Sequence, residues 1–444
     1  MEKLPPTILV IFGITGDLSR RFLLPALAEI CKSTDIGEDF KVLGVSRRQV
    51  DIDEVFGAGE KLLKGYSQMF KIDLSDGAEY EKLKVRLEKL SQEFKQQPQV
   101  IFYLSVPPAA AEAIAGLLGE SGLSKPHMKL LLEKPFGYDL PSAQEMVARI
   151  GKYYSENQVY RIDHYLAKEM AQNITVFLGS NALFRDVWNK EYISDIEITV
   201  AEKIGIEGRA HFYENTGALR DITQSHLLQL AALVLMEPCS DIFDFEEIPR
   251  RRLAALKAIA PVDKNKYREQ VIRAQYEDYQ DEIKNPGSDV ETFVSLRLES
   301  TEPRWKGVPI RLTTGKNLDQ KLTEIRVSFK KVSSASANQL CFRIQPNEGI
   351  ELDLRVKEPG YERKLQKLKW SFSYDQHFPG RLPNAYEMVM VDAMRGNHSL
   401  FASSEEVLAS WQILQPVLEC WALSADDLKI YPPGSTIQQI LDAV

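Results

Sequence analysis

A short stretch, Arg161–Glu169, carries four kinds of side chain that can do chemistry. It reads R-I-D-H-Y-L-A-K-E, and so contains a carboxylate, an imidazole, a phenol and an ammonium beside the start of an apolar helix. The imidazole, phenol and ammonium can donate hydrogen bonds to phosphate oxygens. The stretch therefore favours a site for a phosphorylated sugar. Taken alone, such a motif is more often a strand end followed by a polar helix cap.

A second candidate is a histidine in Leu219–Gln229, which reads L-R-D-I-T-Q-S-H-L-L-Q. From His226 onward this helix is apolar on nearly all sides, which predicts deep burial. A buried imidazole needs a polar partner, and Asp163 is our candidate for it. Without that context, a histidine here is more often a hydrogen-bonded core residue than a catalyst.

A glycine turn follows the first predicted strand, Thr7–Phe12. Gly13 and Gly16 occupy the second and third glycine positions of G-x-G-x-x-G, while Ile11 stands at the first. Glycine there lets the backbone approach a pyrophosphate, which then faces a helix N-terminus. The turn predicts a dinucleotide site, with these residues contacting the cofactor: Gly13, Thr15, Gly16, Asp17 and Leu18.

The second predicted strand, Phe40–Ser46, is followed by Arg47 and Arg48. An NAD-selective enzyme normally places an acid at this point, against the ribose 2′-hydroxyl. Two guanidiniums instead offer bidentate donors to a 2′-phosphate, so we expect the cofactor to be NADP. The alternative is a pair of solvated surface arginines.

Two proline-containing turns follow later strands of the same pattern. Pro107 follows Val100–Val106, and Glu133–Gly137 follows Leu130–Leu132. Open α/β sheets bind ligands at the carboxyl ends of their strands, so we expect Pro107 and Lys134 to lie at the cofactor site. A merely structural turn remains the alternative for each.

The elements that must position these groups divide the chain in two. At 444 residues it exceeds one ordinary core. The first 160 or so residues alternate short apolar runs with helical patterns, which predicts a doubly wound parallel sheet of Rossmann type. From about Asp195 longer strands alternate in polarity, which predicts an α+β domain with a large, mainly antiparallel sheet. We read the acidic, tyrosine-rich stretch Tyr267–Asn285 as a surface excursion.

Composition excludes several function classes. Hydrophobic residues make up 44% and charged residues 27%, as in soluble globular proteins. The net charge of −8 gives no indication of a nucleic-acid or anionic-membrane partner. We found no signal peptide and no apolar run of membrane-spanning length, so we expect a cytoplasmic protein. The four cysteines are scattered without metal-ligand spacing, and we expect no metal.

Taken in their order along the chain, the motifs resemble those of the glucose-6-phosphate dehydrogenase family from about Leu9 to about Trp421. The family pattern R-I-D-H-Y-L-G-K-E differs at Ala167, the glycine turn differs at Phe22, and R-D-x-x-Q-N-H-L-L-Q differs at Ser225. A G-V-P…G-K loop of the family matches residues 307–309 and 315–316.

The resemblance implies a Rossmann domain over residues 1–163 and a substrate-binding and dimerisation domain over 164–444. It implies oxidation of glucose 6-phosphate at C1 to 6-phosphoglucono-δ-lactone with NADP, without a metal, by a homodimer or a dimer of dimers. His226 would be the base and Asp163 its orienting partner. The substrate residues would be Lys134, His164, Tyr165, Lys168, Glu202, Asp221, Lys316 and Lys321.

Two other functions remain open. The first is a sugar oxidoreductase of the glucose–fructose oxidoreductase type, which would not need His164, Tyr165 and Lys168 for a phosphate. The second is a catalytically silent NADPH-binding sensor, which would not need the acid–base pair Asp163 and His226.

Overall fold

The computed structural model describes residues 3–33, 39–57, 60–239, 241, 244–332, 337–378 and 380–443. The chain forms two compact units. Unit 1 comprises Met1–Gly137, Pro141–Ala167 and Pro383–Ser404, and unit 2 comprises Tyr138–Leu140, Lys168–Leu382 and Glu405–Val444. Residues 383–404, which the sequence analysis assigned to the second domain, therefore group with unit 1. The domain boundary expected between residues 163 and 164 stays a prediction.

Unit 1 is built on a sheet whose described strands run in the order β15-β6-β5-β4-β1-β2-β3. All neighbouring pairs are parallel except β15 with β6, so the predicted Rossmann-type sheet is confirmed. All six residues of β1 are buried, as expected for a strand covered on both faces. The strands are β1 (Thr7–Phe12), β2 (Phe40–Ser46), β3 (Ser67–Lys71), β4 (Gln99–Leu104), β5 (Met128–Leu132), β6 (Val159–Ile162) and β15 (Phe401–Ala402).

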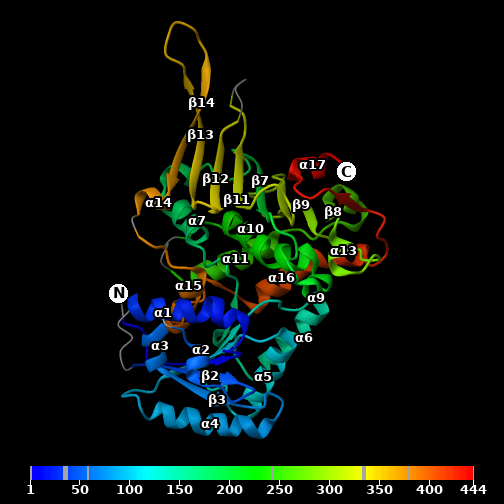
Figure 1. Ribbon diagram of the computed structural model, residues 1–444. Coiled ribbons are helices and arrows are strands. Elements are labelled where there is room, and N and C mark those ends of the chain that lie inside the picture. The colour runs from blue at the N-terminus through cyan, green and yellow to red at the C-terminus, as the bar shows by residue number, and fades with distance from the viewer. Residues whose placement is uncertain are drawn as a thin grey trace. The chain divides into compact units, whose positions relative to one another are not determined.

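Helices cover this sheet. A distant segment, α15, packs beside α1 in one hydrophobic core (Figure 1). Asn384 and Glu387 form a capping box at the start of α15, and Gly396 ends it at a φ of +80°. The helices are η1 (Ser19–Leu23), α1 (Leu24–Ser33), α2 (Ile52–Val55), α3 (Lys61–Gly65), α4 (Gly77–Ser91), α5 (Pro108–Glu120), α6 (Leu140–Gly151), η4 (Glu156–Gln158) and α15 (Ala385–Arg395).

Unit 2 contains a larger sheet, whose described strands run in the order β14-β13-β12-β11-β7-β10-β9-β8-β16. Only the pairs β7–β10 and β8–β16 are parallel among these, which confirms the predicted, mainly antiparallel sheet. Figure 1 shows β13 and β14 extending as a long ribbon. The strands are β7 (Ile193–Ala201), β8 (Val271–Tyr276), β9 (Phe293–Leu298), β10 (Ile310–Gly315), β11 (Leu322–Phe329), β12 (Gln339–Gln345), β13 (Gly349–Lys357), β14 (Leu365–Ser373) and β16 (Leu428–Tyr431).

The helix after His226 is fully buried, as predicted from its apolar sequence. Two tryptophan indoles satisfy carbonyl groups of its last turn, since Trp188 donates to Val234 at 2.9 Å and Trp305 donates to Leu235 at 2.7 Å. None of the helices described has both the length and the apolar character to cross a membrane. The helices of unit 2 are α7 (Glu169–Ser180), α8 (Ala182–Arg185), α9 (Ala210–Glu214), η5 (Leu219–Leu227), α10 (Leu228–Leu235), α11 (Glu247–Ala258), η6 (Lys264–Lys266), α12 (Tyr267–Gln270), α13 (Tyr279–Ile283), α14 (Tyr374–His377), α16 (Ser404–Trp421) and α17 (Ile437–Asp442).

The interpretation of Tyr267–Asn285 as a surface excursion was wrong, because this stretch contains the buried strand β8. Tyr276 and Tyr279 are both fully buried. Their rings fill the core while their hydroxyls donate to the carboxylates of Glu282 and Glu214. In the sequence, the tyrosine-rich stretch therefore suggested a polar surface, whereas the structure places these tyrosine rings in the core.

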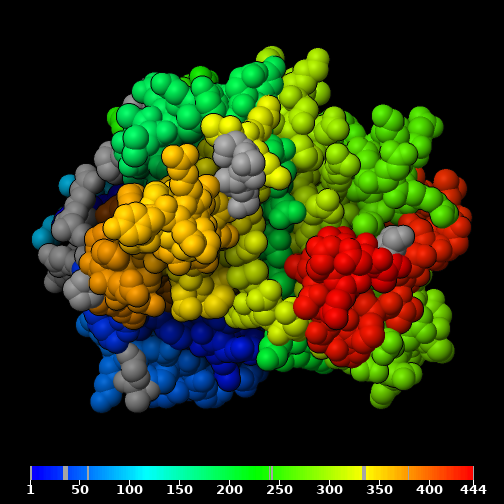
Figure 2. All heavy atoms as spheres, turned by 90° about the horizontal axis from the view of Figure 1, so that it is seen from above, coloured from blue at the N-terminus to red at the C-terminus, as the bar shows by residue number. Residues whose placement is uncertain are grey.

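The sequence analysis also did not predict the last strand, β16. It pairs in parallel with β8 at the edge of the sheet. Figure 2 shows the C-terminal residues, in red, lying on the surface of unit 2.

Candidate active site

Gly13 shapes the turn after β1. Its φ is +80°, and an added Cβ would lie only 2.2 Å from the carbonyl oxygen of Ser105. The Gly16 amide donates to the Gly13 carbonyl at 2.9 Å, and Ser19 Oγ donates to the same oxygen at 3.0 Å. The chain then enters η1 directly. This geometry allows a backbone to approach a pyrophosphate in front of a helix N-terminus.

A cavity of about 570 Å³ lies at this turn, and we call it the dinucleotide cavity. It adjoins the carboxyl ends of β1, β2 and β4, where parallel sheets bind ligands. A cavity lined by a glycine turn and two exposed arginines fits a phosphorylated dinucleotide. The predicted cofactor residues that line it are Gly13, Thr15, Gly16, Arg47, Arg48 and Pro107.

Some residues of this cavity were not predicted, and some predicted residues lie outside its lining. Leu74, Ser105 and Ala110 line the cavity. Ser105 follows β4 directly, so its place after a parallel strand could have identified it. The exposed side chain of Asp17 forms an ion pair with Arg21 at 3.3 Å instead, and Leu18 packs against the hydrophobic core.

The two arginines at the end of β2 are both exposed. Arg48 Nη1 lies 3.5 Å from Glu54 Oε2, a long ion pair. In the described part of the chain, no acid forms an ion pair with Arg47. These guanidiniums can therefore turn toward an anionic ligand without breaking a buried contact.

Glu133 and Lys134 follow β5, and the bond between Lys134 and Pro135 is cis. Tyr103 donates a hydrogen bond to Glu133 Oε1 at 2.5 Å. Burial raises the pKa of Glu133 to about 7, although the bond from Tyr103 and the charge of Lys134 lower it. Gly137 follows, at a φ of +83°. A Cβ added there would lie only 2.7 Å from backbone atoms of Ala143.

Residues 163–167, which follow β6 in unit 1, form a turn. Asp163 is 2% exposed, and its Oδ1 accepts the Tyr165 amide at 2.9 Å. The rings of His164 and Tyr165 are 5.0 Å apart. Ala167, where the family has glycine, is buried. The short side chain therefore fits the available space.

In unit 2, strands β7 and β10 run parallel, so Glu202 and Lys316, which follow them, lie at the same end of the sheet. Their register pairs Ala201 with Gly315, so the residues that follow each strand are adjacent. Lys316 is 2% exposed and forms an ion pair with Glu202. Its ammonium lies 5.2 Å from the ring centre of Tyr213, a cation–π contact.

Tyr213 was not predicted, although it is central to this part of unit 2. Burial and the nearby charges of Asp221, Glu291 and Glu202 raise its pKa well above its usual range, so its hydroxyl stays protonated. We call Tyr213, Glu202, Asp221 and Lys316 the Tyr213 cluster. Two carboxylates and an ammonium around one buried ring suit a ligand with several hydroxyl groups.

Asp221 and His226 lie on η5, a π-helical segment with hydrogen bonds from residue i to i+5. In such a helix, residues five apart are about one turn apart and follow each other on one face. Asp221 is 8% exposed and His226 is fully buried. Asp163 belongs to unit 1 and His226 to unit 2, so their predicted pairing stays a prediction.

The start of η5 is held by Glu291, another residue that the sequence analysis missed. Glu291 Oε1 accepts the Leu219 amide at 2.8 Å, and its carbonyl accepts the Ala218 amide at 3.0 Å. Burial raises the pKa of Glu291 to about 7. Gly217 leaves room for this carboxylate, because an added Cβ would lie 2.5 Å from it.

Lys168 lies at the start of α7 in unit 2, close to Lys321 and Glu348. Its pKa is lowered to about 8, first by burial and then by the charge of Lys321, while Glu348 raises it. Glu348 also accepts the Met170 amide at 2.9 Å. Lys168 and Lys321 thus place two ammonium groups near each other, an arrangement that suits a phosphate monoester.

Comparison with known proteins agrees with this arrangement. Residues 10–173 match the glucose-6-phosphate dehydrogenase NAD binding domain, and residues 175–443 match the C-terminal domain of the same family. The chain belongs to the glucose-6-phosphate dehydrogenase family. It is therefore an oxidoreductase with a nicotinamide cofactor.

Similar proteins of this family cover nearly the whole chain. A glucose-6-phosphate 1-dehydrogenase of Chlamydia muridarum is 37% identical over 99% of this chain and 95% of its own length. The Bacillus subtilis enzyme of the same name is 35% identical over 97% and 95%. A solved structure of a glucose-6-phosphate dehydrogenase in complex with its substrate glucose-6-phosphate superposes with a TM-score of 0.91. It is 30% identical and covers 100% of this chain and 99% of that one.

Of two further departures from the family pattern, Phe22 has a local explanation, and nothing in the described residues explains Ser225. Phe22, where the family has lysine, stacks on Tyr386 of α15 at 5.4 Å, and Arg21 lies over its ring at 5.4 Å. The substitution thus exchanges a cation for packing between two helices of unit 1. Ser225 replaces asparagine on η5, and its buried hydroxyl has no hydrogen-bond partner within the described ranges.

Proposed function

We propose that this chain is a glucose-6-phosphate 1-dehydrogenase that oxidises C1 of glucose 6-phosphate to 6-phosphoglucono-δ-lactone with NADP. The observation that carries the proposal is the half-buried Lys168 near Lys321, a pair of ammonium groups that suits the phosphate. The names of its full-length relatives support the same reaction.

The sugar would be held at both ends. Lys168 and Lys321, together with His164 and Tyr165, would bind the phosphate. Glu202 and Asp221 would accept hydrogen bonds from sugar hydroxyls, and Lys134 and Lys316 would donate to them. The partly buried ion pair of Glu202 and Lys316 supports this role, because it fixes both side chains before the sugar arrives.

His226 would take the proton of the C1 hydroxyl, and Asp163 would orient its imidazole and stabilise the imidazolium. The bound nicotinamide supplies the acceptor for the hydride that leaves C1. As the O–H and C–H bonds break, the C1–O double bond of the lactone forms. A histidine base and a hydride acceptor complete this balance without a metal, and we propose none.

The choice of NADP rests on Arg47 and Arg48 at the dinucleotide cavity. No acid follows β2 at the position that would favour NAD. Guanidiniums at that position can bind a 2′-phosphate bidentately. The remaining cofactor contacts proposed are those of Gly13, Thr15, Gly16, Asp17, Leu18, Pro107 and Lys134.

We also propose a homodimer, or a dimer of such dimers, located in the cytoplasm. One face of the β13–β14 ribbon carries Leu354, Leu368 and Trp370, which lie next to one another in the strand register. Trp370 is 67% exposed and Leu368 41%, an apolar surface that association would bury. Trp370→Glu should yield monomers in analytical ultracentrifugation. An unchanged sedimentation coefficient would contradict this choice of interface.

A spectrophotometric assay of the purified chain tests the main proposal. Glucose 6-phosphate with NADP should give the highest kcat/KM, and free glucose should be a poor substrate because it lacks the phosphate. Equal kcat/KM for the two sugars would favour a sugar oxidoreductase without phosphate recognition. No reduction of either cofactor by a folded protein would favour a silent sensor.

A further inference from the structure

The loop that carries Lys316 is bonded on both sides. On one side it meets the segment after β7: the Asn317 amide donates to the Ile204 carbonyl, and the Leu318 amide donates to the Glu202 carbonyl, each at 3.0 Å. These bonds tie the loop to the residue that forms an ion pair with Lys316. They leave the outer carbonyl groups of the loop to another partner.

That partner is the C-terminal segment that begins with Tyr431, the last residue of β16. Tyr431 donates its hydroxyl to the Lys316 carbonyl at 2.6 Å. The Gly434 amide donates to the Asn317 carbonyl at 2.8 Å, and the Asp319 amide donates to the Ser435 carbonyl at 3.2 Å. Three residues of the loop, Lys316, Asn317 and Asp319, are thus hydrogen-bonded to one short segment from the end of the chain.

The loop needs this support because Asn317 has a φ of +52°. Left-handed backbone is unfavourable for a residue with a side chain, although asparagine tolerates it better than most. The bonds from Tyr431 and Gly434 fall on the carbonyls of Lys316 and Asn317, on either side of the strained dihedral. Without them the loop could relax and move the Lys316 ammonium.

Tyr431 is well placed to hold that carbonyl. It is 2% exposed, and its ring packs edge-on against Tyr276 and Phe293 at 6.4 and 6.0 Å. Its hydroxyl also lies 3.0 Å from Thr292 Oγ1. Burial raises the pKa of Tyr431, so the hydroxyl keeps its proton and remains a donor.

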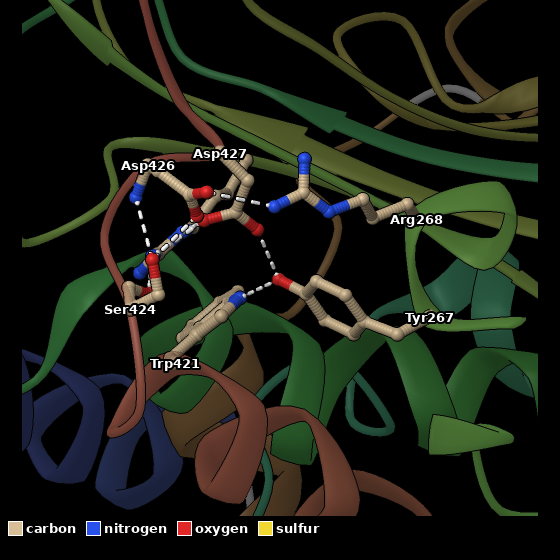
Figure 3. A network of polar contacts seen from close by, with 7 residues as sticks. Tyr267, Arg268, Trp421, Ser424, Asp426 and Asp427 are labelled. Atoms are coloured by element: carbon tan, nitrogen blue, oxygen red, sulfur yellow. Dashed lines mark hydrogen bonds and ion pairs between the residues drawn. The ribbon is translucent and has the colours of Figure 1, made fainter. Parts of the chain in front are cut away.

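The segment itself is fastened by a polar network at its other end (Figure 3). Asp427 accepts hydrogen bonds from Tyr267 at 2.5 Å and from Arg273 Nε at 2.8 Å. Trp421, at the end of α16, donates to the Tyr267 hydroxyl. Arg268 binds the neighbouring Asp426 at 2.9 Å. The end of the chain is therefore anchored before it reaches the loop.

We propose that Tyr431 is a positioning residue for sugar binding, whose hydroxyl holds the Lys316 carbonyl and so fixes the Lys316 ammonium beside Glu202. The proposal rests on the proposed function of Lys316 and extends it to a residue that touches no substrate. It assigns the C-terminal segment a part in substrate affinity as well as in folding.

The test is Tyr431→Phe, which removes only the hydroxyl and keeps the packed ring. KM for glucose 6-phosphate should rise roughly three- to tenfold, the effect of one neutral hydrogen bond. The kcat and the KM for NADP should change little, since neither depends directly on the loop. The matched control is Tyr279→Phe, which removes a buried hydroxyl that donates to Glu214 in the same core cluster.

A purely structural role predicts a different outcome. Both variants would then lower the melting temperature alike and leave KM for the sugar phosphate equal, and that result would overturn the proposal. A similar rise of both substrate KM values in Tyr431→Phe would also overturn it, because it would indicate general loosening.

Lys316→Ala separates this proposal from the proposed function. If Lys316→Ala leaves KM for glucose 6-phosphate unchanged, the assignment of Lys316 fails, and the role of Tyr431 fails with it. If Lys316→Ala raises KM but Tyr431→Phe does not, only the present proposal fails. Adding Tyr431→Phe to Lys316→Ala should raise KM little further, because the hydroxyl acts through the missing ammonium.

Discussion

The dinucleotide cavity of unit 1 and the Tyr213 cluster of unit 2 are built in different ways. The cavity is formed mainly by backbone at a glycine turn, with exposed arginines at its rim. The cluster is formed by charged side chains that are largely buried, such as Lys316 at 2% exposure. A backbone site changes little when one side chain is lost. A buried charged cluster should respond strongly, because removal of one partner leaves another charge uncompensated.

The strongest test of this contrast is His226→Asn in unit 2. If His226 is the base, kcat should fall roughly 10²- to 10⁴-fold, the usual contribution of a positioned base, with a much smaller change in KM. Asp163→Asn should lower kcat less, and the double variant should be little worse than His226→Asn alone. Steady-state kinetics of folded variants measures this.

The control for His226 is His211→Asn, since His211 is an exposed histidine of the same unit. It should retain wild-type kcat. If folded His226→Asn keeps more than about a tenth of wild-type kcat, the proton has another acceptor.

The next largest effect is expected at the phosphate side of unit 2. Lys168→Ala should raise KM for glucose 6-phosphate by roughly 10- to 100-fold, the effect of a lost hydrogen bond to a charged group. Slow turnover of free glucose should remain nearly unchanged. Lys257→Ala, which removes an exposed ion pair with Glu405, is the control and should change neither. A proportional loss of both activities would assign Lys168 to folding or chemistry.

Lys168 also predicts a pH dependence. Its pKa of about 8 means that the ammonium of the free protein loses its proton as pH rises through that value. The kcat/KM for glucose 6-phosphate should therefore fall above about pH 8. Lys168→Arg should move the fall to higher pH, because a guanidinium stays charged. A profile that is identical in both proteins would exclude Lys168 as the titrating group.

A smaller effect is expected at the rim of the dinucleotide cavity. Replacing Arg47 and Arg48 by Ala should raise KM for NADP by roughly tenfold or more, because a 2′-phosphate loses charge-assisted bonds. KM for NAD should change much less. Arg149→Ala, an exposed arginine of the same unit, is the control. Equal changes for the two cofactors would contradict the assignment of NADP.

The smallest effect concerns stability, and it compares one buried carboxyl in each unit. Glu133 and Glu291 each have a pKa raised to about 7 from 4.5 by burial. Between these values the folded state binds more protons than the unfolded state, so each lowers stability as pH rises through that window. Glu133→Gln and Glu291→Gln should each weaken this pH dependence of the melting temperature by a few degrees. Glu145→Gln, at an exposed site, should leave it unchanged.

Local patterns in the sequence predicted unit 1 well. The bounds of β1 and β2 agree with the structure to the residue, because each is marked by neighbours in the chain. The same local patterns failed for Tyr267–Asn285, where the buried Tyr279 donates to the carboxylate of the distant Glu214. They also missed β16, which depends on pairing with a strand more than a hundred residues earlier.

By itself, the sequence determined the fold class, the glycine turn and the chemical types available for a site. These follow from periodicity and from residues adjacent in the chain. Only the tertiary structure decided that Lys316 pairs with Glu202 over Tyr213, that a π-helical segment aligns Asp221 with His226, and that Tyr431 supports the loop. Such contacts join segments far apart in sequence, and they depend on strand register and helix pitch, which no local pattern encodes.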